Sequence, residues 1–345
     1  MERYLNLNFY GYKVIIKTAW PDLRERLRKD FSFFVDSNPG EQSQLTLTIT
    51  REDLLDKHYA NKSFSSSTEK VSFFDESKFR YCLYPTGVKT RFNFSENEAI
   101  VTGEELHSVH EVSYLMILSR VGKGLDLLGL HRVHGAAFEY KGKTSLLAFS
   151  SGVGKTTLLN EVMKKEGVKL LSDDSPLIDS KGKLYAFPLR LGFEKELPFN
   201  LKDAPHYDLN RFHFGLKKLV SIEDLNYEIS TSPGAGYIFT GERGKRRAVK
   251  KVMAFSHVSH LIRESLVGYG LPILIEYFWE PGLRDYGVKT RIVLLRARAL
   301  ICFFLRNNKR RLILKEKSAG KEEPAFHKDK PDKNAVMLID YLESS

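Results

Sequence analysis

Residues 145–157, with the sequence SLLAFSSGVGKTT, constrain the fold more than any other stretch of this chain. Apolar residues suited to a strand run directly into a Gly-rich loop. Beyond the loop, apolar residues recur at helical spacing, at Leu158, Leu159, Val162 and Met163. A strand, a Gly-rich turn and a helix in this order predict an α/β unit whose loop binds phosphate.

Each part of the loop has a physical task. Glycines permit a tight backbone whose N–H groups turn inward around an anion, and the helix N-terminus adds a partial positive charge. Lys155 is placed to reach the outer phosphates, and the Thr156 hydroxyl to ligate Mg²⁺. We therefore expect a nucleoside triphosphate and Mg²⁺ as cofactors; ATP is the nucleotide expected, although no base-reading motif separates it from GTP. The expected nucleotide-binding residues are Ser150, Ser151, Gly152, Val153, Gly154, Lys155, Thr156 and Thr157.

The loop departs from the usual Gly-x-x-x-x-Gly-Lys-Ser/Thr pattern at its first position. Phe149 stands where that pattern has glycine. The N–H groups that hold phosphate come mainly from residues nearer the lysine, so a side chain here does not exclude binding. The alternative interpretation is an ordinary Gly-rich β–α turn.

The composition limits the class of protein. The chain has 345 residues, of which 42% are hydrophobic, so two domains with real cores are expected. We find no apolar run near twenty residues and no signal-peptide core, and therefore expect no membrane span and a cytoplasmic location. Cys82 and Cys302 lie in strand-like contexts and suit buried thiols. The net charge of +11 comes partly from basic clusters without interleaved aromatic residues, so nucleic acid is not the expected partner.

The chain divides into three parts by pattern. Residues 1–103 contain several strand-like runs, including the strict alternation at residues 45–50, and predict a smaller β-rich domain. Residues 104–125 predict a connecting helix. Residues 126–345 hold the phosphate loop and predict a nucleotide-binding domain, so the fold class expected is α+β or α/β.

Three further groups of residues are candidates for metal binding, proton transfer or phosphate binding. Asp173 and Asp174 follow a short apolar strand, where side chains project toward the loop in nucleotide sites, and two neighbours on a strand face opposite ways. We expect Asp173 to bind Mg²⁺ with Thr156, and Asp174 to act on an incoming hydroxyl. His134 is expected on a neighbouring strand as a proton carrier. Arg190 and Arg243 are weaker candidates for holding phosphate.

These residues together resemble the active site of the bacterial HPr kinase/phosphorylase group. In that family a His-Gly pair precedes the loop lysine by 21 residues, as His134 does here (155 − 134 = 21), and an Asp-Asp pair follows the loop helix. The resemblance covers about residues 130–280. It implies a mixed-sheet domain related to phosphoenolpyruvate carboxykinases, with catalytic Asp174, His134 and Lys155, where Asp174 is the general base. The arginine motif tied to the family's reverse reaction has no clear counterpart here.

The chain looks like the divergent relatives that accompany ribosomally made peptides, including lasso peptides, where they act as peptide-modifying kinases. By this resemblance the expected activity is transfer of the γ-phosphoryl group to a Ser or Thr hydroxyl of a peptide or small protein. Two alternatives remain open: a small-molecule hydroxyl kinase, and a nucleotide-dependent switch or ATPase without transfer. A homo-oligomer also remains open.

Overall fold

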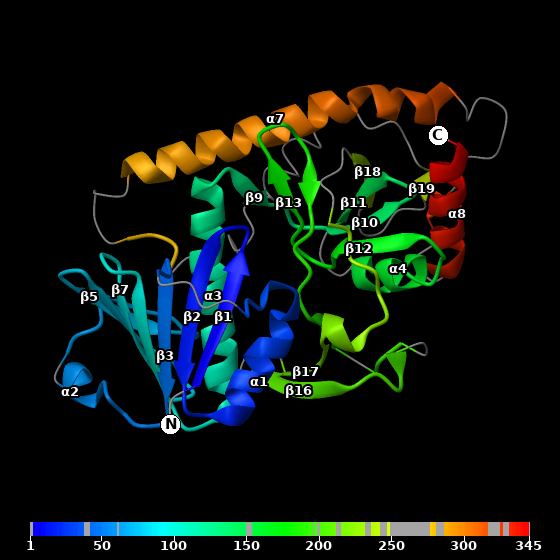
Figure 1. The fold of residues 1–345 in the computed structure, drawn as a ribbon. Helices are drawn as coiled ribbons and strands as arrows, with labels where there is room; N and C mark the ends of the chain where they lie inside the picture. Colours follow the sequence, from blue (N-terminus) through cyan, green and yellow to red (C-terminus); the bar gives the residue numbers. More distant parts are fainter. Residues whose placement is uncertain are drawn as a thin grey trace. The chain divides into compact units, whose positions relative to one another are not determined.

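The computed structural model shows a mixed α+β protein (Figure 1). It describes residues 3–37, 42–60, 62–149, 154–194, 196–198, 201–211, 215–231, 236–241, 247–248, 277–280, 286–316, 325–326 and 331–344. The chain forms two compact units. Unit 1 comprises Met1–Leu125, Gly192–Leu225 and Gly268–Thr290, and unit 2 comprises Asp126–Leu191, Asn226–Val267 and Arg291–Ser345. The domain boundaries near residues 103 and 125 stay predictions.

An eight-stranded mixed sheet dominates unit 1. Its strand order is β1-β2-β3-β8-β7-β6-β5-β4. Strand β3 pairs in parallel with both β2 and β8, while the other pairs are antiparallel. The strands are β1 (Arg3–Phe9), β2 (Tyr12–Thr18), β3 (Leu45–Thr50), β4 (Ser66–Ser67), β5 (Ser72–Glu76), β6 (Phe79–Leu83), β7 (Lys89–Asn93) and β8 (Glu98–Thr102).

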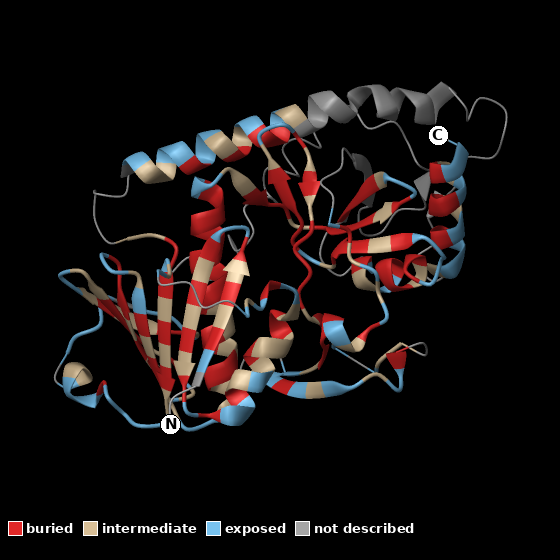
Figure 2. Ribbon diagram, viewed as in Figure 1, coloured by how far each residue is buried: buried red, intermediate tan, exposed pale blue. Residues whose placement is uncertain are grey.

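Side-chain alternation explains why these segments are strands. In β3 the apolar residues Leu45, Leu47 and Ile49 are buried, and the threonines between them are half-buried. The same alternation appears along β2 (Figure 2). A period of two places every second side chain on one face of the sheet, which becomes the core face. The half-buried strand predicted at residues 45–50 is confirmed.

Helices and a small sheet complete unit 1. Helix α3 covers residues 106–125 of the predicted connecting segment, starting two residues later than predicted and ending two residues later, at Leu127. Strands β15, β17 and β16 form a three-stranded sheet in that order. The remaining elements are α1 (Pro21–Asp30), η1 (Ser32–Phe34), α2 (Asp56–Tyr59), α3 (Leu106–Leu127), β15 (Leu191–Phe193), β16 (His206–Arg211), β17 (Gly215–Val220) and η3 (Ile222–Asp224).

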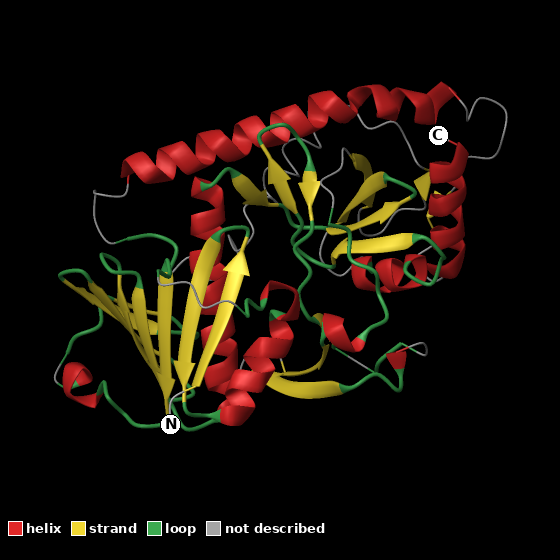
Figure 3. Cartoon of the chain, in the orientation of Figure 1, coloured by secondary structure: helices red, strands yellow, loops and turns green. Residues whose placement is uncertain are grey.

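Unit 2 is built on a four-stranded mixed sheet of order β12-β10-β11-β18, with β11 and β18 parallel (Figure 3). A second sheet has the order β14-β13-β9, and helix α8 packs against α4. The elements are β9 (Leu130–Arg132), β10 (Ala136–Tyr140), β11 (Lys143–Phe149), α4 (Lys155–Val162), β12 (Val168–Ser172), β13 (Leu177–Asp179), β14 (Leu184–Tyr185), β18 (Gly236–Gly241), β19 (Arg247–Ala248), α7 (Tyr286–Glu316), β20 (Ala325–Phe326) and α8 (Pro331–Ser344).

The long helix α7 corrects the sequence-based expectation for its region. The strand-like interpretation around Cys302 is wrong, because Cys302 lies within α7 and is only partly buried. The buried residues Ile292, Arg296, Ala299 and Leu300 recur at helical spacing. A continuous apolar run does not by itself distinguish a buried strand from a helix.

A buried ionic cluster anchors α7 within unit 2. Asp126, at the end of α3, is fully buried and accepts hydrogen bonds from Arg296 Nε at 2.8 Å and from His131 Nδ1 at 2.8 Å. Burial acts to raise the pKa of Asp126, but the guanidinium of Arg296 and the hydrogen bonds outweigh it, so the pKa lies below its usual value. The ionised carboxylate is therefore the form that stabilises the fold.

We predict that Asp126→Asn destabilises the protein in a pH-dependent way. At pH 7 the variant should lose about 3 kcal/mol of unfolding free energy, because Arg296 keeps its charge in the core without a counter-charge. Since the folded-state pKa is lowered, the stabilisation is complete above the unfolded pKa of about 3.9 and disappears as pH falls through the folded value. Urea unfolding between pH 7 and pH 3 measures the difference, which should shrink below about pH 4.

The exposed residue Asp203 provides the matched control. Asp203→Asn should leave the unfolding free energy within about 0.5 kcal/mol of the wild type at every pH. A loss for Asp126→Asn that stays constant from pH 7 to pH 3 contradicts the ionic account of this cluster.

Candidate functional site

A two-stranded hairpin precedes the Gly-rich segment. Strands β10 and β11 pair antiparallel from Ala136↔Leu147 to Tyr140↔Lys143. Gly154 caps α4 with φ +93°, a left-handed conformation that glycine adopts at little cost. Ser150, Ser151, Gly152 and Val153 lie outside the described residues, so their nucleotide-binding role stays a prediction.

Helix α4 begins at Lys155, directly after the loop. Leu158, Leu159 and Val162 are buried, as their spacing predicted, so one face of the helix is fixed against the core. Lys155 itself is only 9% exposed. Thr157 is exposed at the same end of the helix. The residues at this end of the helix that are predicted to contact phosphate are therefore held by a packed helix.

A chain of polar contacts joins the three predicted catalytic residues. Lys155 Nζ lies 2.8 Å from His134 Nε2, and His134 Nδ1 lies 3.2 Å from Asp174 Oδ1. An ammonium group only donates hydrogen bonds, so Nε2 accepts from Lys155 and carries no proton. The proton of the neutral ring is then on Nδ1, where it is donated to Asp174. The contacts assign His134 as the neutral Nδ1–H tautomer.

Pairing between two chain segments places His134 beside Asp174. Strand β9 pairs with β13 up to Arg132↔Leu177. The pairing continues past the strand ends, with Val133 N donating to Pro176 O and Gly135 N to Asp174 O, each at 2.9 Å. His134 therefore lies in a bend between β9 and β10, and the prediction that it lies on a strand is wrong.

Glycine at position 135 permits a close approach to β11. A Cβ atom at Gly135 would lie 2.9 Å from Leu146 Cδ1 and 3.0 Å from Leu147 O. The second contact is with backbone and cannot be relieved by a rotamer change. The His-Gly pair is thus explained by packing as well as by chemistry.

The aspartate pair lies in a bend just after β12, and its backbone is fixed by serine. Ser172 Oγ accepts hydrogen bonds from Asp174 N at 3.3 Å and Ser175 N at 3.0 Å. Ser175 Oγ donates to Asp174 Oδ2 at 3.2 Å. Sequence reasoning missed both serines, although Ser at these offsets is a recognised turn signal. They orient the carboxylate that His134 contacts.

The environment of Asp174 favours its ionised form. Partial desolvation acts to raise the pKa of this carboxyl, but the hydrogen bond from His134 and the charge of Lys155 outweigh it and lower the pKa to about 2. The side chain nevertheless keeps 59% of its surface exposed. Charged and polar neighbours, rather than burial, therefore control its protonation, and the carboxylate remains accessible.

Asp173 faces a different partner. Its Oδ2 accepts a hydrogen bond from Thr156 Oγ1 at 3.2 Å. A hydroxyl and a carboxylate oxygen are hard ligands of the kind Mg²⁺ prefers, and Mg²⁺ commonly takes one or two carboxylates together with phosphate and water. The donor pair fits this cation. Within the described ranges, no cluster of three or more His, Cys, Asp or Glu side chains suits a metal held by protein alone.

Five predicted site residues are therefore brought together from three segments of unit 2. His134 comes from the β9–β10 bend, Lys155 and Thr156 from the start of α4, and Asp173 and Asp174 from the bend after β12. Arg190 lies half-buried in the segment before β15, and its role stays a prediction. Arg243 lies outside the described residues.

Comparison of the chain with known protein families and with curated proteins finds no match. The family resemblance thus rests on the residues quoted above. Of the helices that the structure describes, none has both the length and the apolar character needed to cross a bilayer.

We predict that Gly135→Ala is destabilising by about 1–3 kcal/mol, because the added methyl group must displace the backbone of β11. Chemical denaturation measures the loss. Gly287→Ala is the matched control, since a Cβ there meets no atom within 4 Å and the helical residue has no positive φ. An unfolding free energy equal to that of the wild type for Gly135→Ala would show that the approach to Leu147 is not tight.

We also predict that His134→Ala raises the pKa of Asp174 from about 2 toward the usual aspartate value of about 3.9. The variant loses the hydrogen bond that favours the ionised form. A ¹³C NMR titration of the Asp174 carboxyl group between pH 1.5 and pH 6 measures the shift. An unchanged midpoint in His134→Ala would contradict the assigned Nδ1–H donor.

Proposed function

We propose that this protein is an ATP- and Mg²⁺-dependent kinase that transfers the γ-phosphoryl group to a Ser or Thr hydroxyl of a peptide or small protein. The observation that supports it best is the contact chain Lys155–His134–Asp174 beside the pair Thr156–Asp173. Phosphoryl transfer requires mainly positioning and charge neutralisation, and this set contains a residue type for each requirement.

Lys155 supplies positive charge for the outer phosphates. Thr156 and Asp173 would hold Mg²⁺, which when bound neutralises charge on the phosphate oxygens. The preceding loop, residues 150–154, would contribute backbone N–H groups to the phosphates. A buried lysine at the start of a packed helix loses little side-chain entropy on binding, which favours a preorganised anion site.

Asp174 would orient the acceptor hydroxyl. A carboxylate with a pKa of about 2 is a weak base. This is compatible with transfer, because a loose transition state does not require the acceptor hydroxyl to lose its proton early. The acceptor proton can pass to Asp174 late, while His134 and Ser175 hold the carboxylate in place. In this proposal His134 is a positioning residue for Asp174 as well as a neighbour of Lys155.

The acceptor class follows from the family resemblance and from exposure. Because 59% of the Asp174 side chain is accessible, a hydroxyl presented on a peptide can approach it. A small-molecule kinase with the same residues would need an enclosed acceptor pocket around the carboxylate. Exposure therefore favours a peptide or protein acceptor over a small molecule.

We predict that Asp174→Asn lowers the rate of phosphoryl transfer by about 10²–10⁴-fold while ATP affinity changes less than threefold. The protein would be incubated with γ-labelled ATP and a library of Ser- and Thr-containing peptides, and the acceptor identified by mass spectrometry. Lys155→Ala should weaken nucleotide binding itself, since it removes the charge that meets the phosphates. Glu161→Gln, near the C-terminal end of α4 and paired with Lys164, is the matched control and should transfer at the wild-type rate.

Three outcomes separate the candidate functions. Label on a peptide hydroxyl that requires Asp174 supports the proposal. Label on a metabolite hydroxyl, with no peptide labelled, favours a small-molecule kinase. ATP binding or slow hydrolysis without any acceptor, equal in the wild type and Asp174→Asn, overturns transfer and leaves a nucleotide-dependent switch.

A further inference from the structure

The part of α7 that belongs to unit 2 has one buried face and one exposed face (Figure 2). Ala299 and Leu300 lie in the hydrophobic core of unit 2. Arg296 reaches the buried carboxylate of Asp126 from the same face. These contacts fix the rotation of the helix about its axis. The opposite face carries a stripe of four exposed residues, which we call the α7 stripe: Arg291, Leu294, Arg298 and Ile301.

The α7 stripe has the spacing of a helix–helix contact. Steps of three, four and three residues keep side chains on one face of a helix, and the same steps separate the a and d positions of two packed helices. Leu294 is 64% and Ile301 is 50% exposed. A single exposed aliphatic residue is ordinary, but two of them one heptad apart form the d positions of a surface that another helix can cover.

The two arginines make the α7 stripe basic. Among the residues that the structure describes, neither Arg291 nor Arg298 takes part in an ion pair or a side-chain hydrogen bond. Residues 286–315 of α7 contain nine Lys or Arg and no Asp or Glu. A guanidinium is a planar fork that matches the two oxygens of a carboxylate. Charge complementarity therefore calls for carboxylates on the molecule that covers this face.

Two other occupants fit the α7 stripe less well. A second copy of the same helix would bring arginine opposite arginine, and like charges across such a contact repel. A helix that lies on a bilayer has its apolar and basic residues on different faces. Here the arginines alternate with the aliphatic residues within one stripe, so fixed carboxylates between apolar side chains are the better complement.

We infer that the α7 stripe binds an acidic amphipathic helix of a protein or peptide partner. Apolar side chains of the partner pack on Leu294 and Ile301, and its Glu or Asp side chains pair with Arg291 and Arg298. The net charge of +11 also favours the approach of an acidic partner. This surface is independent of the proposed phosphoryl transfer.

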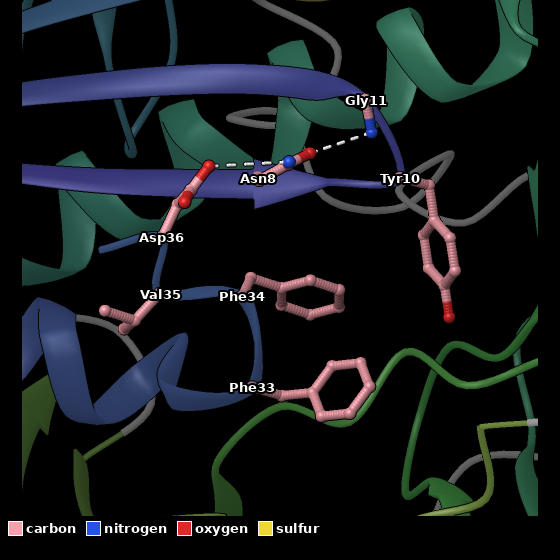
Figure 4. Close-up of a pocket in the computed structure, with 7 residues that line it drawn as sticks. All are labelled: Asn8, Tyr10, Gly11, Phe33, Phe34, Val35 and Asp36. Atoms are coloured by element: carbon pink, nitrogen blue, oxygen red, sulfur yellow. Dashed lines mark hydrogen bonds between the residues drawn. The ribbon is translucent and has the colours of Figure 1, made fainter. Parts of the chain in front are cut away.

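A pocket in unit 1, at the turn between β1 and β2, offers a different kind of site (Figure 4). Tyr10, Phe33 and Asp36 are among the residues that line it. Its volume of about 320 Å³ lies at the lower end of the range for ligand sites, and a helix about 10 Å across does not fit it. Because Phe33 is 37% exposed, Phe33→Ala detects a probe that inserts a side chain there instead of binding α7.

The test uses the full chain without ATP. A fluorescein-labelled helical peptide of three heptads, with Glu at each a position and Leu at each d position, is titrated by fluorescence anisotropy. Arg298→Glu should weaken its binding about tenfold, and Leu294→Ala about threefold, because each removes one contact of the stripe. Val293→Ala is the matched control, since Val293 is 53% exposed on the same helix but lies outside the stripe, and it should leave the affinity unchanged.

A charge exchange separates pairing at the stripe from general attraction and from loss of folding. The same peptide with Lys in place of Glu should bind the wild type at least tenfold more weakly, and Arg298→Glu should strengthen its binding about tenfold. Wild-type affinity for the Glu peptide in both Arg298→Glu and Leu294→Ala overturns the inference, and so does a loss confined to Phe33→Ala. Binding to phosphatidylserine vesicles that requires Arg298, without binding of the Glu peptide, overturns it in favour of a membrane contact.

Discussion

The candidate site depends on the antiparallel pairing that extends β9 and β13 beyond their ends. The hydrogen bonds from Val133 to Pro176 and from Gly135 to Asp174 align two bends that are about forty residues apart in sequence. Without this alignment nothing else in the local structure would bring His134 close to Asp174, because neither residue lies in a helix or a strand. The absence of a Cβ at Gly135 lets the same bend approach β11, the strand that leads to Lys155. One backbone arrangement thus supports the whole polar chain.

The local parts of this site were predictable, since each depends on neighbours in sequence. The alternating and apolar patterns of residues 136–172 predicted β10, β11, α4 and β12, and the structure confirms them. The non-local parts were not predictable. Nothing near His134 in sequence indicates that Nδ1 faces Asp174, because that contact arises from pairing between two segments that are separated in sequence by β10, β11, α4 and β12. A turn at Ser172 could be predicted from the sequence. Its contribution to the site became apparent only from the hydrogen bond that Ser172 Oγ accepts from Asp174 N.

Helix α7 is a case in which the sequence pattern does not distinguish a helix from a strand. Its residues 292–302 are almost continuously apolar, apart from arginines, so a strand and a helix explain the sequence equally well. The choice is decided by tertiary contacts, above all by Arg296, which lies on the buried face and reaches Asp126. A buried arginine breaks the apolar pattern that would have identified this face. The ion pair between Arg296 and Asp126 therefore helps to fix how the helix packs. The same charged residue interrupts the apolar pattern, so the buried face of the helix could not be identified from the sequence.

Adjacent aspartates with separate partners explain how one bend can serve two tasks. A strand would place Asp173 and Asp174 on opposite faces of a sheet, which separates them too far for a compact site. The bend instead directs Asp173 to Thr156 and Asp174 to His134, while both remain next to the start of α4. A metal-binding oxygen and an acceptor-orienting oxygen must lie on either side of the transferred group, a few ångströms apart. The bend provides one carboxylate with each of these two partners, which is the division of tasks that the proposed phosphoryl transfer requires.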